Sequence, residues 1–202
     1  MMDNVLESGV VMRKLEIGPG YDGKRLEGFE TLDIQKRDNV DHVADASGKL
    51  PFDDNSFNLV YAAHVLEHFY WRQVEDALKE WCRIIKPGGA LEIWVPDGLM
   101  VAEHWLMAEK GNAKLIKKYN LKTYRRSMVK QDPCLWANAK INSIGGIHHP
   151  PFGDHKVFFS RRYLNKALVQ AGFLKVKKLT RKQIRGKDYG HYQIGVIAKK
   201  GE

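Results

Sequence analysis

The chain has 202 residues, 44% of them hydrophobic, and a formal net charge of +9 at pH 7. Such a length and composition are typical of one globular domain with a sizeable core, so we expect a single domain over residues 1–202. The sequence has no run of about eighteen apolar residues and no basic leader followed by an apolar segment, so we expect no membrane span, no secretion signal and a cytoplasmic location.

A short strand followed by a glycine turn opens the predicted sheet. Residues 14–17 form the strand, and the turn at 18–20 is built from small residues that let another molecule approach the backbone. A second strand over residues 30–34 carries Asp33 at its carboxyl end, where open parallel sheets bind ligands and where a carboxylate accepts hydrogen bonds from ribose hydroxyls. These two strands therefore predict a site for a nucleoside-containing cofactor.

The glycines of this turn also match another cofactor pattern. Gly18, Gly20 and Gly23 satisfy the G-x-G-x-x-G spacing of dinucleotide-binding domains. That pattern needs a full helix before the acid, whereas residues 21–29 leave room for about two helical turns. A nicotinamide or flavin enzyme is the weaker alternative, because no long helix would offer its N-terminus to a pyrophosphate.

Two more strands are predicted before the first long helix. Residues 42–45 form a short strand, and residues 57–63 are a nearly continuous apolar run, typical of a buried parallel strand. The segment HVLEHF at 64–69 follows the carboxyl end of that strand and should border the ligand crevice. Within this segment, Glu67 and His68 could line the crevice as functional residues, or they could have only the structural role of capping the next helix.

Apolar residues recur at helical spacing over residues 71–86, and the Pro-Gly-Gly sequence at 87–89 ends this predicted helix. Trp81 lies on its apolar face, so we expect it in the core. Cys82 in this helix and Cys134 in a loop-like region lack the spacing of a metal site or disulfide framework, and we expect both to be reduced bystanders.

The remaining predicted elements complete a sheet. Residues 90–95 form a fifth strand, and one or two amphipathic helices follow over residues 101–118. Ser160 caps a further helix that ends at Gly172. Residues 173–179 and 192–198 form two last strands, which we expect as an antiparallel hairpin at the edge of a mixed sheet.

Several motifs, in this order, resemble those of the class I S-adenosylmethionine-dependent methyltransferases. They are EIGPG at 16–20, DA at 45–46, LPFDDNSFNLV at 50–60 and RIIKPGGAL at 83–91. Together they are far more specific than one glycine pattern. The resemblance covers residues 12–96 and a carboxyl-terminal portion. It implies an α/β fold, with a Rossmann-like seven-stranded mixed sheet flanked by helices and an insertion after the fifth strand.

The resemblance also implies S-adenosyl-L-methionine as the cofactor. The residues that match its binding motifs are Glu16, Gly18, Pro19, Gly20, Asp33, Ile34, Asp45, Ala46 and, through the backbone, His64. Two positions depart from the family pattern, because Asp22 stands where many members have a third glycine and Asn58 replaces the usual aspartate. These departures leave open a catalytically inactive partner protein that binds a nucleoside.

The cofactor fold does not explain residues 98–156. Segments of this length are usually functional, and insertions at this place in the resembled family form the substrate lid. Three histidines lie near its end, His148, His149 and His155, and histidine is the side chain best suited to take a proton near neutral pH. We expect His68, His149 or His155 to be the general base and expect no metal site, although histidines with an acid can also bind a divalent ion.

The acceptor is indicated by resemblance and by charge. The short link between the first two strands, the VLEHF segment and HKVFF at 155–159 resemble small, type 11-like methyltransferases found with sugar and polysaccharide synthesis. This implies a hydroxyl on a small molecule or glycan. Basic clusters at 114–130 and 175–187 favour an anionic acceptor. An RNA methyltransferase is the alternative, although no RNA-binding module is recognisable.

Overall fold

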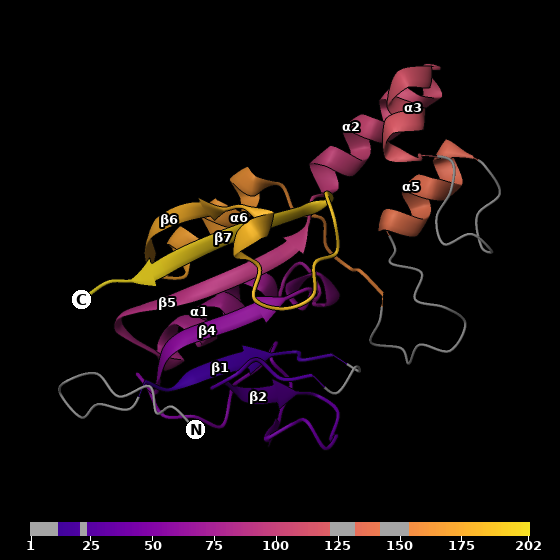
Figure 1. Ribbon diagram of the computed structural model, residues 1–202. Helices are drawn as coiled ribbons and strands as arrows, with labels where there is room; N and C mark the ends of the chain where they lie inside the picture. The colour runs from indigo at the N-terminus through magenta and orange to yellow at the C-terminus, as the bar shows by residue number, and fades with distance from the viewer. Residues whose placement is uncertain (1–11, 21–23, 122–131, 142–153) are drawn as a thin grey trace.

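The computed structural model describes residues 12–20, 24–121, 132–141 and 154–202. Seven strands form one mixed sheet in the order β3-β2-β1-β4-β5-β7-β6, with helices packed against it, which confirms the expected fold class (Figure 1). The strands are β1 (Lys14–Ile17), β2 (Glu30–Asp33), β3 (His42–Val43), β4 (Phe57–Ala63), β5 (Ile85–Pro96), β6 (Phe173–Leu179) and β7 (Gln193–Lys200). The helices are η1 (Leu66–His68), α1 (Val74–Ile84), α2 (Gly98–Glu109), α3 (Ala113–Tyr119), α5 (Pro133–Ile141), α6 (Arg161–Gln170) and η2 (Arg181–Gln183).

The strand order reverses between β1 and β4. The strand β1 pairs in parallel with β2 on one side and with β4 on the other, and β4 pairs in parallel with β5. The strand β7 runs antiparallel to both β5 and β6, as expected for the closing hairpin. The carboxyl ends of β1, β2 and β4 therefore meet at a topological switch point, which is where open α/β sheets bind ligands.

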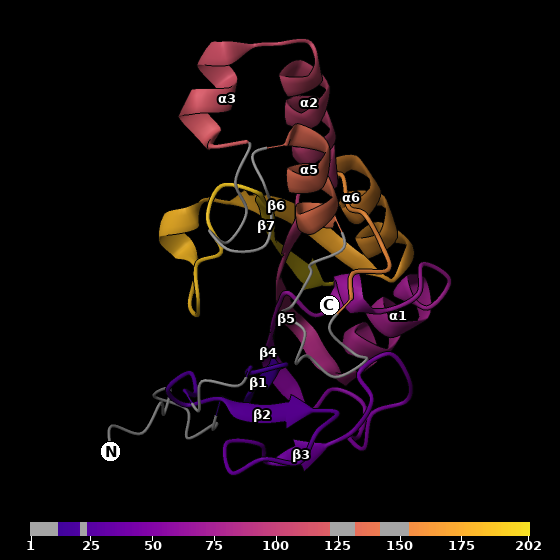
Figure 2. The ribbon, with the colours of Figure 1, turned by 90° about the vertical axis from the view of Figure 1, so that its right-hand side faces the viewer.

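The main apolar core lies between the sheet and helices α1 and α6, which cover the same face (Figure 2). Leu15 of β1, Val60 of β4 and Trp81 of α1 are fully buried in it. Complete burial of a large apolar side chain contributes roughly 2–3 kcal/mol. The indole N–H of Trp81 also donates to the carbonyl oxygen of Ala46, at 2.9 Å. The expected core position of Trp81 is confirmed.

The opposite face of the sheet carries a smaller cluster that includes Tyr61 and Trp94. The segment between β6 and β7 packs over it, where Arg185 donates to the carboxylate of Glu92 at 2.7 Å. Trp94 faces Gly195 of β7 across the sheet, and a Cβ at Gly195 would lie 2.3 Å from the indole ring. Glycine is therefore the residue that lets the ring lie flat across β7.

The strand β5 begins at Ile85, whereas the sequence pattern predicts it only after the Pro-Gly-Gly sequence at 87–89. Ile85 pairs with Phe57, and a register shift follows directly. A Cβ at Gly89 would lie 3.0 Å from the carbonyl oxygen of Asn58. The glycine thus allows a bulge that keeps the strand paired, instead of ending the helix and starting a loop.

Two further elements differ from the sequence prediction. The third strand ends at Val43 and not at residue 45. Cys134 lies in α5 and not in a loop. Pro133 occupies the first helical position there, and the Asp132 carboxylate accepts the N–H of Leu135 at 3.0 Å, so the sequence does contain a helix start.

The insertion after β5 folds into α2, α3 and α5, which pack on one another around Val101, Leu121 and Trp136. Figure 1 shows these helices beyond the carboxyl end of β5. Tyr192, directly before β7, packs against Trp136 with ring centroids 5.4 Å apart. Its hydroxyl lies 2.8 Å from Nδ1 of His104. The insertion is therefore anchored to the sheet at the entrance of β7. In the part of the chain described, no helix is both long and apolar enough to cross a membrane.

Glu30 of β2 joins the first three strands through charged hydrogen bonds. Arg13 donates to both its carboxylate oxygens, at 2.8 and 2.9 Å, and Nε2 of His42 lies 2.9 Å away. The hydrogen bonds from Arg13 hold the pKa of Glu30 below its ordinary value. This bidentate geometry is the strong form of an ion pair.

We expect Gly195→Ala to lower the free energy of unfolding by about 1–3 kcal/mol, the usual cost of overpacking, because the methyl group meets the Trp94 ring. Urea unfolding measures this change. Gly48→Ala is the control, since its Cβ would meet only the Asp45 carbonyl oxygen at 3.8 Å, and it should change stability little. Equal effects of the two substitutions would contradict the close packing of Trp94 on β7.

Glu30→Gln should alter the acid dependence of stability. The folded-state pKa of Glu30 lies below the unfolded one, so the carboxylate stabilises the fold above the unfolded pKa, and this contribution is lost as pH falls through the folded pKa. The partly exposed pair is worth at most about 1 kcal/mol. Urea unfolding across pH should show a smaller acid loss in Glu30→Gln than in the wild type. Asp76→Asn, at an exposed acid, should follow the wild-type curve.

Candidate functional site

The glycine turn after β1 lies at the carboxyl ends of β1 and β2, and its three residues, Gly18, Pro19 and Gly20, are all partly exposed. Gly18 has a φ of 70° and Gly20 a φ of 80°, the left-handed region that favours glycine. A Cβ at Gly18 would lie 2.5 Å from the Val65 side chain, whereas a Cβ at Gly20 would meet nothing within 4 Å. The turn is therefore packed tightly on one side and open on the other.

Hydrogen bonds from neighbouring segments fix this turn. The N–H of Gly18 donates to the carbonyl oxygen of Leu32 in β2, at 2.8 Å. Glu16 is buried, and its Oε2 accepts the N–H of Leu26 at 3.2 Å. Glu16 thus holds the short link between β1 and β2 in place, directly before the turn.

Asp33 ends β2 beside the turn. Its Oδ1 accepts the N–H of Gln35 at 2.9 Å, and its Oδ2 accepts a hydrogen bond from Arg37 at 2.5 Å. Each carboxylate oxygen can accept more than one hydrogen bond. The next side chain, Ile34, is 43% exposed. The end of β2 therefore presents a carboxylate and an apolar surface together.

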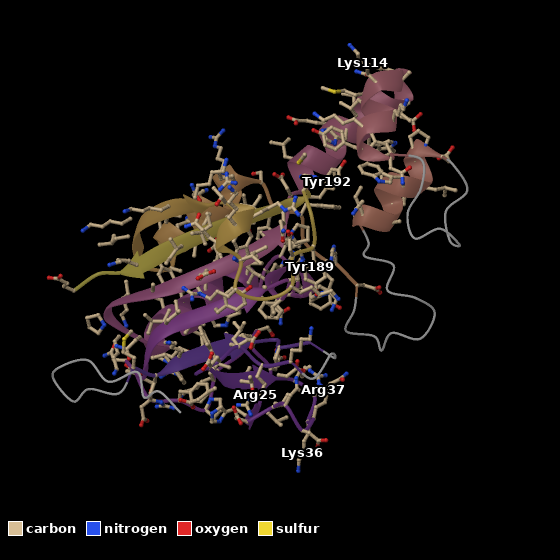
Figure 3. The ribbon with its side chains drawn as sticks, in the orientation of Figure 1. Arg25, Lys36, Arg37, Lys114, Tyr189 and Tyr192 are labelled. Atoms are coloured by element: carbon tan, nitrogen blue, oxygen red, sulfur yellow. The ribbon has the colours of Figure 1, made fainter. Side chains whose placement is uncertain are left out.

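Sequence reasoning missed Arg37, which lies beyond the carboxyl end of β2 (Figure 3). The signal that points to it is a basic residue four positions after the acid. Arg37 fixes the orientation of the Asp33 carboxylate before any ligand arrives.

Asp45 and Ala46 form the loop after β3. Oδ1 of Asp45 accepts the N–H of Ser47 at 2.8 Å, and its carbonyl oxygen accepts the N–H of Gly48 at 3.1 Å. Ala46 is 6% exposed, and its carbonyl oxygen is the acceptor for Trp81. Hydrogen bonds within the loop and the one from Trp81 of α1 therefore fix its conformation.

His64 follows β4 with a φ of 58°, a rare conformation for a residue with a side chain. Its Nδ1 lies 3.0 Å from Oε1 of Glu67, and its Nε2 lies 3.1 Å from Oε1 of Gln193. The amide nitrogen of Gln193 donates to Asp188 and to the Gly190 carbonyl oxygen, so its oxygen must face His64. Both ring nitrogens of His64 thus face acceptors, which favours the imidazolium form.

The charges of His64 and Glu67 support each other. Burial by itself lowers the pKa of His64, but the Glu67 carboxylate and the two hydrogen bonds raise this pKa overall. Burial raises the pKa of Glu67, but the charge of His64 and the hydrogen bond from it lower this pKa overall. The two side chains therefore form a buried ion pair, and His64 stays protonated, so it is not suited to act as a general base.

Two more histidines flank Glu67. Nε2 of His155 lies 3.7 Å from Oε1 of Glu67, and the rings of His68 and His155 have centroids 5.2 Å apart. Burial lowers the pKa of His155 to about 4, so its imidazole is neutral near pH 7. The structure thus brings together two of the three predicted catalytic histidines. The third, His149, lies outside the described residues.

The alternative that Glu67 and His68 cap the following helix is not found. They form the separate turn η1, and the N-cap of α1 is Gln73. The side chains of Glu67 and His68 are thus directed to other partners than the end of α1.

The comparisons with known proteins concern the sequence family and the fold. Residues 28–93 match the family model of a methyltransferase domain. This match and the seven-stranded fold together support a class I S-adenosylmethionine-dependent methyltransferase, which is the family that the sequence motifs resemble. The ubiquinone/menaquinone biosynthesis C-methyltransferase UbiE of Neisseria meningitidis is 53% identical over 49 residues, which are 24% of this chain and 19% of the relative. The match thus spans about a fifth of that curated relative's length.

Solved class I methyltransferases share the fold at low identity. A methyltransferase from Thermotoga maritima has 21% identity and a TM-score of 0.53, over 93% of this chain and 81% of its own. Phosphoethanolamine N-methyltransferase 2 from Haemonchus contortus, in complex with S-adenosyl-L-methionine, has 12% identity and a TM-score of 0.53, over 95% of this chain and 49% of its own. These likenesses concern the fold alone.

We expect Glu67→Ala to lower the free energy of unfolding by about 3 kcal/mol or more, because it leaves His64 buried without its counter-ion. Urea unfolding in the presence of a chelator measures this change. Glu103→Ala, at an exposed acid of α2, is the control and should change stability by less than about 0.5 kcal/mol. A second test is the double substitution with His64→Ala, which should cost clearly less than the sum of the single ones.

Proposed function

We propose that the chain transfers a methyl group from S-adenosyl-L-methionine to a small molecule. The observation that carries this proposal is the open glycine turn beside Asp33, at the point where the strand order reverses. The family match over residues 28–93 supports it. When bound, the cofactor supplies an electrophilic methyl group on a sulfonium.

The residues at the switch point fit such a cofactor. The backbone of the turn at Gly18 and Gly20 would lie along its methionine part, since only the open side of the turn has room. Asp33 would accept hydrogen bonds from the ribose hydroxyls, and the exposed side chain of Ile34 would pack on the adenine. The loop of Asp45 and Ala46 would close the adenine side, and the backbone near His64 would hold the amino acid end.

The rest of the chain would position the acceptor. Methyl transfer is an in-line displacement, so the main work of the protein is to align the acceptor and exclude water. The insertion at 98–156, with α2, α3 and α5, would form the lid that selects the acceptor. His68 or His155, whose rings lie next to each other, would take a proton from it, and His149 remains a prediction.

For the acceptor we propose a small molecule with an ionisable hydroxyl. A hydroxyl on a small molecule or glycan is what the sequence predicts, whereas the curated relatives are named C-methyltransferases. Loss of a hydroxyl proton activates the oxygen and, in a phenol, the ring carbon as well, so one deprotonated group would serve either product. The lysines of α3 favour an anionic acceptor.

Calorimetric titration with S-adenosyl-L-methionine, with NAD as the control ligand, tests the cofactor. We expect micromolar binding of the former only, and we expect Asp33→Ala to weaken it roughly 10- to 100-fold, the scale of lost charge-assisted hydrogen bonds. Asp38→Ala, at an exposed acid near the end of the same strand, is the matched control and should leave the affinity unchanged.

Absence of cofactor binding by the wild-type protein would contradict the proposal, and an unchanged affinity in Asp33→Ala would contradict the ribose role. Methyl incorporation into phenols, sugars and RNA then identifies the acceptor class. Binding without incorporation into any acceptor would favour the inactive partner protein. Incorporation into RNA, with steep salt dependence, would favour the RNA methyltransferase.

A further inference from the structure

We propose that Glu67, His68 and His155 bind a divalent transition-metal ion of the zinc type. One potential ligand atom from each residue lies within 4.8 Å of the others. Two imidazoles and one carboxylate suit zinc and its neighbours better than magnesium or calcium, which prefer oxygen ligands alone. From the sequence we expect no metal site and expect these histidines to act as bases, so the metal site differs from that expectation.

The carboxylate of Glu67 has an oxygen that needs a partner. Glu67 is fully buried, and its Oε1 accepts the hydrogen bond from His64. Its Oε2 is also buried and has no hydrogen-bond partner in the part of the chain that the structure describes. An unpaired buried carboxylate oxygen is costly, and a cation held by this oxygen would remove that cost.

Both histidines have their second nitrogen arranged as ligating histidines do. Nδ1 of His68 lies 3.2 Å from the carbonyl oxygen of Asp154, so its N–H donates there and Nε2 keeps its lone pair. His155 is hydrogen-bonded to the backbone of Ile141, while its Nε2 faces Glu67. Backbone carbonyls that accept the outer N–H fix the ring orientation and tautomer of metal-binding histidines.

The backbone holds the ligands together before any ion binds. The N–H groups of Lys156 and Val157 donate to the carbonyl oxygen of Glu67, at 2.7 and 3.3 Å, so the segment of His155 is tied directly to η1. Glu67 is buried, whereas His68 and His155 are only partly buried, which leaves a path from solvent. A site with such preorganised ligands binds without a folding cost.

The position of the site gives the ion a use. Val65 contacts the glycine turn and Glu67 follows it in the chain, so the three ligands lie next to the cofactor cradle. Three protein ligands leave room for one more, which would be the hydroxyl of the acceptor, and a bound cation lowers the pKa of such a hydroxyl. This use rests on the proposed function, whereas the binding of the ion does not. The lone pairs that bind the ion cannot also take a proton, so the ion replaces the histidine base.

Calorimetric titration of the chelator-treated full chain with Zn²⁺ tests the site directly. We expect one ion per chain with micromolar or tighter affinity, and we expect His68→Ala and His155→Ala each to weaken it at least about tenfold. His191→Ala is the matched control, because His191 is exposed, lies beside Arg181 and does not belong to the cluster of Glu67, His68 and His155. It should leave the affinity unchanged.

The pair His148 and His149 lies outside the described residues and provides a competing location. Their double substitution by Ala should keep the affinity. Loss of binding in that variant, with normal binding by His68→Ala and His155→Ala, would overturn the proposal, as would the absence of any binding by the wild type. Binding of Mg²⁺ with equal affinity would overturn the assignment to the zinc class.

A spectroscopic test does not depend on activity. Co²⁺ added to the wild type should give visible absorption of a low-coordinate nitrogen and oxygen site, and His155→Ala should lose it while its far-UV circular dichroism shows that it folds. Visible absorption retained in folded His155→Ala would contradict the site. Titration with S-adenosyl-L-methionine on the same samples separates the two proposals. Cofactor binding without metal binding would contradict only the metal site. Metal binding without cofactor binding would contradict only the methyltransferase function.

Discussion

The buried pair of His64 and Glu67 is the interaction on which the functional edge of the sheet depends. Its members come from the end of β4 and from η1, and Gln193 brings in the start of β7. The backbone oxygen of Glu67 accepts two N–H groups from the segment after His155. Removing the charge of either partner would leave the other unpaired in the core, which is why a short segment with an unfavourable φ at His64 is stable here.

The glycine turn depends on the same edge. Gly18 packs on Val65, which lies between His64 and Glu67 in the chain, so the glycine turn and the histidine cluster are neighbours. Parallel pairing of β1 with β2 and β4 brings these loops together, because all three strands end on the same side. The sheet thus brings the glycine turn and the histidine cluster to one edge, where the proposed cofactor and metal sites would adjoin.

The fold was predictable from the sequence where local pattern and pairing agree. The bounds of the first, fourth and sixth strands are as the pattern predicts. The start of β5 was not predictable, because its glycines serve a bulge against Asn58 that depends on the neighbouring strand. The family resemblance pointed to Asp33. Its ion pair with Arg37 was not predictable, because it depends on where the fold places the two side chains.

The histidine cluster is a second feature whose spatial arrangement could not be predicted from the sequence. Sequence patterns identify Glu67, His68 and His155 as candidates, yet they cannot show that one carboxylate stands among three imidazoles, since His155 comes from a distant segment. Gln193 carries no functional signal in the sequence, but its oriented amide decides that His64 holds its proton.

The neighbour of Gln193, Tyr192, anchors the insertion through His104 and Trp136. Figure 3 shows Tyr192 where the insertion helices meet the sheet. Two consecutive residues at the entrance of β7 therefore serve two purposes, because Tyr192 holds the insertion helices and Gln193, the first residue of the strand, fixes the charge of His64. The insertion helices and the histidine cluster are consequently linked through neighbouring residues, because one peptide bond joins Tyr192 to Gln193 where β7 begins.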